Sequence, residues 1–374
     1  MRLAPFALER WFDQYEFRVE HHISASCAAA TNTAELLALA GPEARQTYLG
    51  LSLDYIETGG TAAYREAVAS WYDRIGPDDV QATLGAAEAI FILMNTITGP
   101  GDRLIVENPN YQSLAEVARA AGAEVLDWPL RPENQWRPDL DELAGLLDKG
   151  GVKAVVINHP HNPTGAILTR DEQAGILAMA EAAGARLISD EVYRGLIYDP
   201  TDVLPPAADL SERAVSIGDL TKPFGLGGLR AGWIATRDHA VLEACAEMHD
   251  YMALCGAAPS EFLAAIALKH RETLLARKMS VARTNREAFR AVVARHPDKL
   301  SWVPPKGGVT AFPAYSARVD SRTFCRGLVE RANTLLLPGA VYGVEGRFRI
   351  GFGGAPKAFS EGLKRLEEYA EDLD

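Results

Sequence analysis

The chain has 374 residues, 48% of them hydrophobic, and a formal net charge of −12 from 38 basic and 50 acidic side chains. This length supports one large domain or two, and the acidic balance argues against a nucleic-acid partner, which needs a clustered basic face. The N-terminal stretch MRLAPFALERWFDQYEF interrupts its apolar residues with acids, and no apolar run is as long as a membrane span. Because the four cysteines also lack C-x-x-C spacing, we expect a cytoplasmic protein with reduced thiols, no leader and no membrane contact.

Short apolar strands alternate with helical patterns along the first two thirds of the chain. A strand is predicted over 80–84 and a helix over 113–121, and five more segments read as buried strands: DRLIVENP, AEVLDWPL, VKAVVINHP, ARLISDEVY and AVSIGDLTK. This alternation is typical of a mostly parallel α/β sheet. Residues 237–296 predict long helices, and further strands are expected in GLGGLRAGWIAT, GVTAFP and RFRIGFG. We expect a large domain over 45–260 and a smaller one formed by both chain ends, 1–44 and 261–374.

The stretch TLGAAEAIF places a glycine between the strand over 80–84 and an apolar helix. The free amides of Ala86 and Ala87 would then point out of the helix N-terminus, which is a common site for an anion. A tight turn that binds nothing explains the same residues, so this stretch alone leaves both interpretations open.

Two further stretches follow predicted strands. HNPTG supplies Asn162 on a backbone restrained by flanking prolines, and SDEVY supplies Asp190 and Tyr193. Asp190 could instead cap the next helix. His159 and His161 have H-x-H spacing, but no carboxylate or cysteine cluster accompanies them, so we expect no metal.

Lys222 lies in GDLTKPFGLGG, directly after another predicted strand. Residues at the carboxyl ends of parallel strands line one crevice, so Lys222, Asn162 and Asp190 are expected to meet there. An anion site, an aromatic residue, an acid and a lysine together suit pyridoxal phosphate.

At this point the sequence resembles a known family, the class I and II aminotransferases within the fold-type-I pyridoxal-phosphate enzymes. The resemblance covers nearly the whole chain and rests on motifs in the family's order: YIETGG, GAAEAI, NPNY, HNPTG, SDEVY, TKPFGLGGLRAGW and RIGFG. It implies an α/β fold with a mostly parallel seven-stranded sheet in the large domain, a smaller α+β domain, and pyridoxal 5′-phosphate as cofactor.

The resemblance also implies how the cofactor's ring is held. Lys222 would form the internal aldimine and, once released, act as the base at the substrate's α-carbon. Asp190 would pair with the protonated pyridine nitrogen, which makes the ring an electron sink. Tyr193 and Asn162 would hydrogen-bond the ring oxygen, and Tyr111 would stack on the ring face.

Phosphate and substrate contacts are implied in the same way. The phosphate would bind the Ala86 and Ala87 amides, the Thr221 hydroxyl, Arg230 and, across a homodimer interface, Tyr55. Arg349, with Asn162 beside it, would bind the substrate's α-carboxylate in a fork of two hydrogen bonds. Strand alternation places Arg347 on the same face as Arg349, so burial alone does not choose between the two arginines. Residues 23–32 are expected to border the substrate as a flap.

Two residues depart from the family's pattern. Asp219 stands where many members carry serine or threonine, and a carboxylate near a phosphate is repulsive unless it points away or pairs with a cation such as Arg230. Pro223 directly follows Lys222 and predicts a backbone at the lysine outside the helical region.

Other functions compete with transamination. GLGGLR suggests a dinucleotide loop, but the sixth position is Arg230 rather than glycine, which argues against a Rossmann oxidoreductase. A non-catalytic binding module would not need lysine, aspartate and arginine together. ALERWFDQYEF, HHISAS and WPLR resemble capreomycidine synthase and related arginine-derivative cyclases, which use the same cofactor for elimination and ring closure. We place transamination between an α-amino acid and a 2-oxo acid first and keep cyclisation as the alternative.

Overall fold

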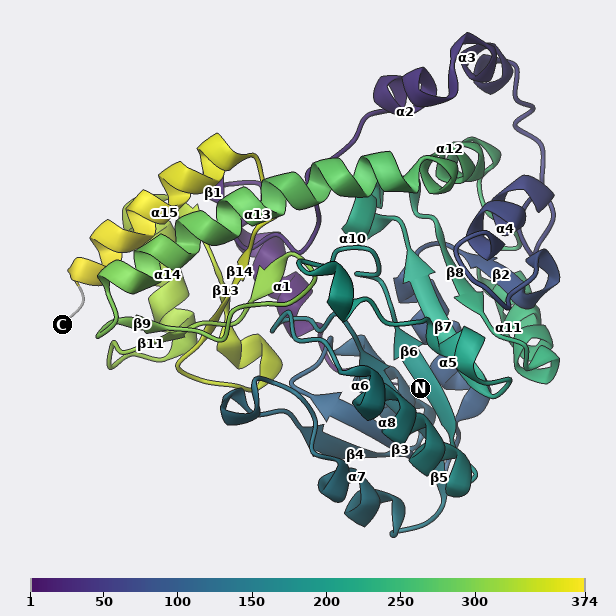
Figure 1. Cartoon of the computed structure of the whole chain (residues 1–374), viewed down its shortest axis with the longest axis horizontal. Coiled ribbons are helices and arrows are strands. Elements are labelled where there is room, and N and C mark those ends of the chain that lie inside the picture. The colour runs from purple at the N-terminus through teal and green to yellow at the C-terminus, as the bar shows by residue number, and fades with distance from the viewer. Residues whose placement is uncertain (1, 373–374) are drawn as a thin grey trace.

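A seven-stranded sheet forms the centre of the computed structural model, which describes residues 2–372 (Figure 1). Its strands lie in the order β2-β8-β7-β6-β5-β3-β4, and β8 is antiparallel to both of its neighbours while the pairs among β7, β6, β5, β3 and β4 are parallel. The predicted mostly parallel α/β sheet is confirmed. The strands are β2 (Val80–Thr83), β3 (Arg103–Asn108), β4 (Glu124–Pro129), β5 (Val152–Asn158), β6 (Arg186–Asp190), β7 (Ala214–Asp219) and β8 (Gly232–Ala235).

Helices cover both faces of this sheet, which explains why its strands read as continuous apolar runs. Along β5, Val156 packs in one hydrophobic cluster with α5 and α6, whereas Val155 packs in another with α7 and α8. The helices on the first face are α5 (Ala86–Ile97), α6 (Ser113–Ala121) and α11 (His239–Met252), and those on the second are α7 (Leu140–Leu147), α8 (Arg170–Ala182) and α9 (Ala207–Leu210).

A third cluster packs at the β2–β8 edge of the sheet, where Trp233 and Val80 meet helices from three parts of the chain. α12 (Ala258–Lys269) contacts both α4 (Ala62–Ala69) and α2 (Thr33–Ala40), and α3 (Pro42–Leu49) packs on α2. The ribbon of α2 and α3 projects from the body of the molecule (Figure 1).

The C-terminal part of the chain packs with the first residues. β1 (His21–His22) pairs with β12 (Thr334–Leu335), and α13 (Arg271–Arg295) runs from α12 toward α15 (Pro356–Glu371) (Figure 1). The domain boundaries at 45 and 260 stay a prediction. The remaining elements here are α1 (Ala7–Tyr15), α14 (Ser321–Ala332), β9 (Leu300–Ser301), β10 (Thr310–Ala311), β11 (Ala314–Tyr315), β13 (Leu337–Pro338), β14 (Phe348–Gly351) and the 3₁₀ turn η5 (Gly339–Tyr342).

Register brings the strand ends of the sheet together. Asn158 is the partner of Asp190, and Asp190 is the partner of Ile217, two residues before the end of β7, so the carboxyl ends of β5, β6 and β7 lie at one edge. Among residues 2–372, no helix combines the length and apolar character needed to cross a membrane. Short turns complete the chain: α10 (Thr221–Phe224), η1 (Pro77–Asp79), η2 (Pro132–Asn134), η3 (Pro200–Asp202) and η4 (Gly227–Leu229).

Candidate active site

A cavity of about 330 Å³ opens at the carboxyl ends of β5, β6 and β7. Ten of the residues singled out from the sequence line it: Ala86, Ala87, Tyr111, Asn162, Asp190, Tyr193, Thr221, Lys222, Arg230 and Arg349. Tyr55 does not line the cavity, and its side chain is 80% exposed. The geometry therefore gathers all these residues except Tyr55 within one chain, and their individual roles stay predictions.

Lys222 lies in the short helix α10, so the prediction of a non-helical backbone before Pro223 is wrong. Pro223 falls in the first turn of α10, where its missing N–H has no helical partner to lose. Asp219 supplies the cap, since its Oδ1 accepts from the amides of Thr221 at 2.9 Å and Lys222 at 3.3 Å. The Asp219 carboxylate is thus engaged at the start of α10, while Arg230 donates elsewhere, to the carbonyls of Leu84 and Gly227.

The Lys222 amine points into the cavity beside the segment that precedes α2. Its Nζ is 3.2 Å from the Ser26 hydroxyl and 3.6 Å from the Cys27 sulfur. Burial lowers the pKa of this amine, but Cys27, Tyr193 and Asp219 raise it by more, so the net shift is upward. The free lysine is therefore a cation held by hydrogen bonds.

Asp190 is almost fully buried at the end of β6. Burial raises the pKa of its carboxyl to about 7, although the Val192 amide, which donates to Oδ1 at 3.2 Å, acts in the opposite direction. A buried carboxylate that has no ion pair with the described residues favours a cation placed against it.

A hydrogen-bond network links the two asparagines at the end of β5. Asn158 donates through Nδ2 to the Asp190 carbonyl and accepts from the Asn162 amide, both at 2.9 Å. The Asn162 Oδ1 in turn accepts from the Tyr342 hydroxyl at 3.0 Å and from Arg349 Nη1 at 3.2 Å. Sequence reasoning missed Asn158 and Tyr342, which hold the predicted residues in place.

The two candidate arginines of β14 lie in different surroundings. Arg349 is 1% exposed beside the cavity, whereas Arg347 lies outside it with its guanidinium 4.8 Å from the Trp136 ring centre. Nε and Nη2 of Arg349 donate to the Ser24 carbonyl, and Nη1 donates to Asn162 and Tyr342. Only one N–H, on Nη2, is left, so a carboxylate that takes two donors would displace a partner of Nη1.

The start of α5 has the geometry of an anion site. Gly85 has φ of +81° and ψ of 170°, a conformation open almost only to glycine, and it turns the chain from β2 into the helix. The N–H groups of the first turn then have no intrahelical partner. Arg230 lies directly over the turn, since a Cβ on Gly85 would be 2.5 Å from its Nη2.

Two buried hydroxyls in this cavity fit the expected cofactor. Tyr193 Oη and Thr221 Oγ1 have no hydrogen-bond partner among the described residues, although both are shielded from water. Burial also raises the pKa of Tyr193, so its phenol stays protonated and able to donate. A ring oxygen and a phosphate are acceptors for such groups, and a protonated pyridine nitrogen is a partner for Asp190. The residues present therefore fit pyridoxal phosphate.

Residues 25–27 form one wall of the cavity, and the expectation that the segment over 23–32 borders the substrate stays a prediction. Its backbone is tied down by the Ala28 amide, which donates to the Lys222 carbonyl at 3.0 Å. Three glycines also leave room for its carbonyl oxygens, because a Cβ would lie 2.1 Å from that of Ala29 at Gly225, 1.8 Å from that of Ala25 at Gly351 and 1.9 Å from that of Cys27 at Gly353. The wall depends on glycine at all three positions.

Helix α1 contributes residues to the site that sequence reasoning missed. Leu8, Glu9 and Phe12 of α1 and Glu16, the C-cap of the helix, line the cavity at a spacing that places them on one helix face. Burial and the charge of Glu9 raise the pKa of Glu16, while Lys222 and Arg349 lower it. The sequence ALERWFDQYEF contains a signal for this role. Its apolar residues predict a helix with one buried side, and Glu9 and Glu16 lie next to that side.

The histidines of HNPTG have structural partners. His159 Nε2 is 2.7 Å from Glu107 Oε1, and His161 lies between Thr164 and the Pro109 carbonyl. Burial lowers the pKa of His161 to about 4, so it is neutral at neutral pH. Within residues 2–372, no group of three or more histidine, cysteine, aspartate or glutamate side chains is placed to bind a metal ion.

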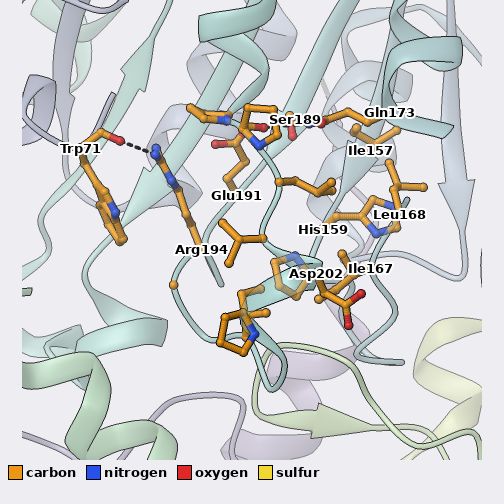
Figure 2. Close-up of a pocket in the computed structure, with 18 residues that line it drawn as sticks. Trp71, Ile157, His159, Ile167, Leu168, Gln173, Ser189, Glu191, Arg194 and Asp202 are labelled. Carbon is orange, nitrogen blue, oxygen red and sulfur yellow. Dashed lines mark hydrogen bonds between the residues drawn. The ribbon is translucent and has the colours of Figure 1, made fainter. Parts of the chain in front are cut away.

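Figure 2 shows the residues that line a second cavity, of about 320 Å³. It lies on the opposite face of the sheet, because Ile157 and Ser189 line it while the next residue of each strand, Asn158 or Asp190, lines the first cavity. The chain after β6 separates the two cavities, because Asp190 and Tyr193 line the first while Glu191 and Arg194 line the second. Glu191 accepts from the Ala207 amide, and Arg194 donates to the Trp71 carbonyl, as Figure 2 shows for the latter. These hydrogen bonds hold the far side of the wall that carries Asp190.

Comparisons with known proteins agree with this geometry. Residues 24–366 match the family model for aminotransferase class I and II. The chain is 34% identical to capreomycidine synthase from Streptomyces vinaceus over 98% of this chain and 94% of that protein. A pyridoxal-phosphate-dependent aminotransferase from Streptococcus suis superposes with a TM-score of 0.95 at 28% identity, covering 100% and 99% of the two chains. The pyridoxal-phosphate-dependent cyclase OrfR superposes with a TM-score of 0.91 at 32% identity, covering 100% and 98%. The chain therefore belongs to the class I and II aminotransferase family, which implies pyridoxal phosphate as its cofactor.

Proposed function

We propose that this protein is a pyridoxal-phosphate enzyme that acts on an α-amino acid with a positively charged side chain, by elimination and ring closure. The observation that carries the substrate class is the pair of acids, Glu9 and Glu16, on the face of α1 that lines the cavity. Similarity over almost the full chain to capreomycidine synthase and to a cyclase supports the reaction type. Transamination of the same kind of amino acid is the second candidate, supported by the superposition on an aminotransferase.

The proposal assigns tasks to the polar residues of the cavity. When bound, pyridoxal phosphate supplies an electron sink for negative charge at the substrate's α-carbon. Lys222 binds the cofactor covalently and, when released, moves the α-proton. Asp190 keeps the ring nitrogen protonated, and Arg349 orients the α-carboxylate. The cofactor's remaining contacts are assigned to Tyr111, Asn162, Tyr193, Thr221, Arg230, the Ala86 and Ala87 amides and the Tyr55 of a second subunit.

The substrate's side chain would lie against α1. His22 is 3.7 Å from Glu16, but burial and Arg349 lower the pKa of His22 to about 4, so His22 is neutral and does not form an ion pair with Glu16. A guanidinium offers several donors and a permanent charge to two such carboxylates. An arginine derivative offers a guanidinium to these two acids and an α-carboxylate to Arg349, which lines the same cavity.

Ring closure on a hydroxylated arginine balances without a second substrate. The hydroxyl leaves the carbon next to the α-carbon and a guanidine nitrogen bonds to that carbon, so that the net loss is water. Transamination instead consumes a 2-oxo acid in every cycle. The decisive experiment supplies the holoenzyme with hydroxylated arginine alone and measures product by mass spectrometry. Continuous loss of water supports cyclisation, and turnover only after a 2-oxo acid is added supports transamination.

The substrate class has its own test. In a Glu9→Gln/Glu16→Gln variant the dissociation constant for arginine, followed by the cofactor's absorbance, should rise about 10-fold, because two charged partners are lost. Citrulline, which has a neutral urea in place of the guanidinium, should bind as it does to the wild type. Asp13→Asn is the matched control, since Asp13 lies on α1 outside the cavity and is 70% exposed. An equal loss of affinity for arginine and for citrulline would refute an ionic contact between the two acids and the guanidinium.

A further inference from the structure

A buried group of ionisable side chains lies behind the turn that begins α5. It consists of Glu88 on α5, His249 on α11 and Glu261 on α12, which are 9%, 1% and 3% exposed. We refer to these three residues as the acid–histidine cluster and to residues 84–87 as the phosphate turn. None of the three lines the active-site cavity.

The cluster holds the phosphate turn through its backbone. Glu88 Oε2 accepts a short hydrogen bond from the Leu84 amide, and Arg230 Nη2 donates to the Leu84 carbonyl at 3.0 Å. The Leu84 residue is thus fixed at both its N–H and its C=O. Since Leu84 precedes Gly85, this fixes the direction in which the Ala86 and Ala87 amides point.

Charge at this position has two opposite effects. A carboxylate in the first turn of a helix is stabilised by the N-terminal end of the dipole. The same carboxylate repels a phosphate bound at that N-terminus, and repulsion is strong in a region shielded from water. Glu88 would therefore weaken phosphate binding unless a positive charge stood beside it.

His249 is placed to supply that charge. Its Nδ1 is 3.4 Å from Glu88 Oε1, and among the described residues neither ring nitrogen has a hydrogen-bond partner. Glu261 lines the same small cavity as His249, with its Oε1 unpaired and its Oε2 accepting from the Thr61 amide at 2.6 Å. The other polar side chains that line this small cavity are Tyr64, Thr83, Arg230 and Ser260.

We propose that Glu88 and His249 are positioning residues for the cofactor phosphate. Glu88 orients the phosphate turn, and His249 offsets the charge of Glu88 so that the turn accepts a dianion. This inference concerns the family's cofactor and is independent of whether the enzyme cyclises or transaminates its substrate.

The test compares two ligands of the cofactor-free protein. Pyridoxal has the ring and aldehyde of pyridoxal phosphate but lacks the phosphate, so an effect on the phosphate turn should separate the two. In His249→Gln, the dissociation constant of pyridoxal phosphate should rise about 10-fold while that of pyridoxal stays unchanged. His239→Gln, on the exposed first turn of the same helix, is the matched control and should bind both ligands normally.

A double-mutant cycle identifies the mechanism. Glu88→Gln keeps an oxygen for the Leu84 amide but loses the charge, so it should bind pyridoxal phosphate as tightly as the wild type or more tightly. In that background His249→Gln should have no further effect. The proposal would be overturned if Glu88→Gln and His249→Gln weakened pyridoxal phosphate binding independently. It would also be overturned if His249→Gln weakened the binding of pyridoxal as much as that of pyridoxal phosphate. If His249→Gln does not fold, weaker binding of pyridoxal phosphate by Glu88→Gln alone would overturn it.

Discussion

Asp190 is a buried ionisable carboxyl, and its ionisation lowers the folding stability of the cofactor-free protein. Its folded-state pKa of about 7 lies above the ordinary value of 3.8, so the ionised form destabilises the fold. The penalty is absent below pH 3.8 and increases as the pH rises toward about 7, reaching at most about 4 kcal/mol.

Replacing Asp190 by asparagine should therefore have opposite effects on folding and on catalysis. Without cofactor, Asp190→Asn should unfold at a higher temperature than the wild type at pH 8, and the difference should vanish near pH 4. With cofactor, exchange of the substrate's α-proton should fall by orders of magnitude, because the ring nitrogen loses the charge that keeps it protonated. Calorimetry and proton exchange by NMR measure the two effects, and near-normal exchange would mean that Asp190 is not the ring's partner.

The two arginines of β14 predict contrasting variants. Arg349→Lys should raise the Michaelis constant for α-amino acids about 10-fold or more and leave the cofactor content unchanged, because lysine offers a point charge in place of a planar fork. Arg347→Lys should change the Michaelis constant little, since its guanidinium lies over Trp136 outside the cavity. Steady-state kinetics distinguish them, and the reverse order of effects would assign the carboxylate to Arg347.

At the level of elements, the turn from β2 into α5 depends on one backbone conformation. Gly85→Ala should lower the free energy of unfolding by roughly 1–3 kcal/mol, because φ of +81° is strained for alanine. It should also weaken pyridoxal phosphate binding, since the new Cβ would displace Arg230. Gly145→Ala is the control, because Gly145 lies inside α7 with nothing within 4 Å of the added Cβ. That variant should gain about 0.5–1 kcal/mol.

The sheet strands could be predicted, together with the strand ends that Asn162, Asp190 and Lys222 follow or terminate. Strands buried on both faces are continuous apolar runs, which can be recognised without knowing the tertiary structure. Helix α1 could not be assigned to the site, since nothing local in its sequence says which distant surface its acidic face meets. The prediction of a non-helical backbone at Lys222 uses only the preference of a residue that precedes proline. The structure differs because the Asp219 carboxylate, three residues before Lys222, caps α10. His249 and Glu88 meet only through the packing of α11 on α5.

At the scale of the whole molecule, Tyr55 predicts a shared site. Its side chain is 80% exposed, and Leu49 and Leu53 in the same region are also exposed, at 68% and 84%. We expect a homodimer in which Tyr55 reaches the partner's phosphate. Mixing Lys222→Ala with Tyr55→Phe should restore activity after subunit exchange, because one of the two sites in the mixed dimer is then intact. No recovery, with exchange verified by native mass spectrometry, would rule out a shared site.

Three glycines contact the backbone of residues 25–29, and they show which positions near the cavity tolerate substitution and which do not. Gly225 lies far from Gly351 and Gly353 in the sequence, yet each of the three meets a carbonyl of the same segment too closely for any side chain. Residues 25–27, in contrast, line the cavity, and the side chains of Ser26 and Cys27 contact the Lys222 amine. A combinatorial library at 25–27 should therefore yield folded enzymes with new substrate preferences, whereas a library at the three glycines should yield few folded members. Evolution of a new activity on this scaffold can change the lining of the wall while its backbone path stays fixed.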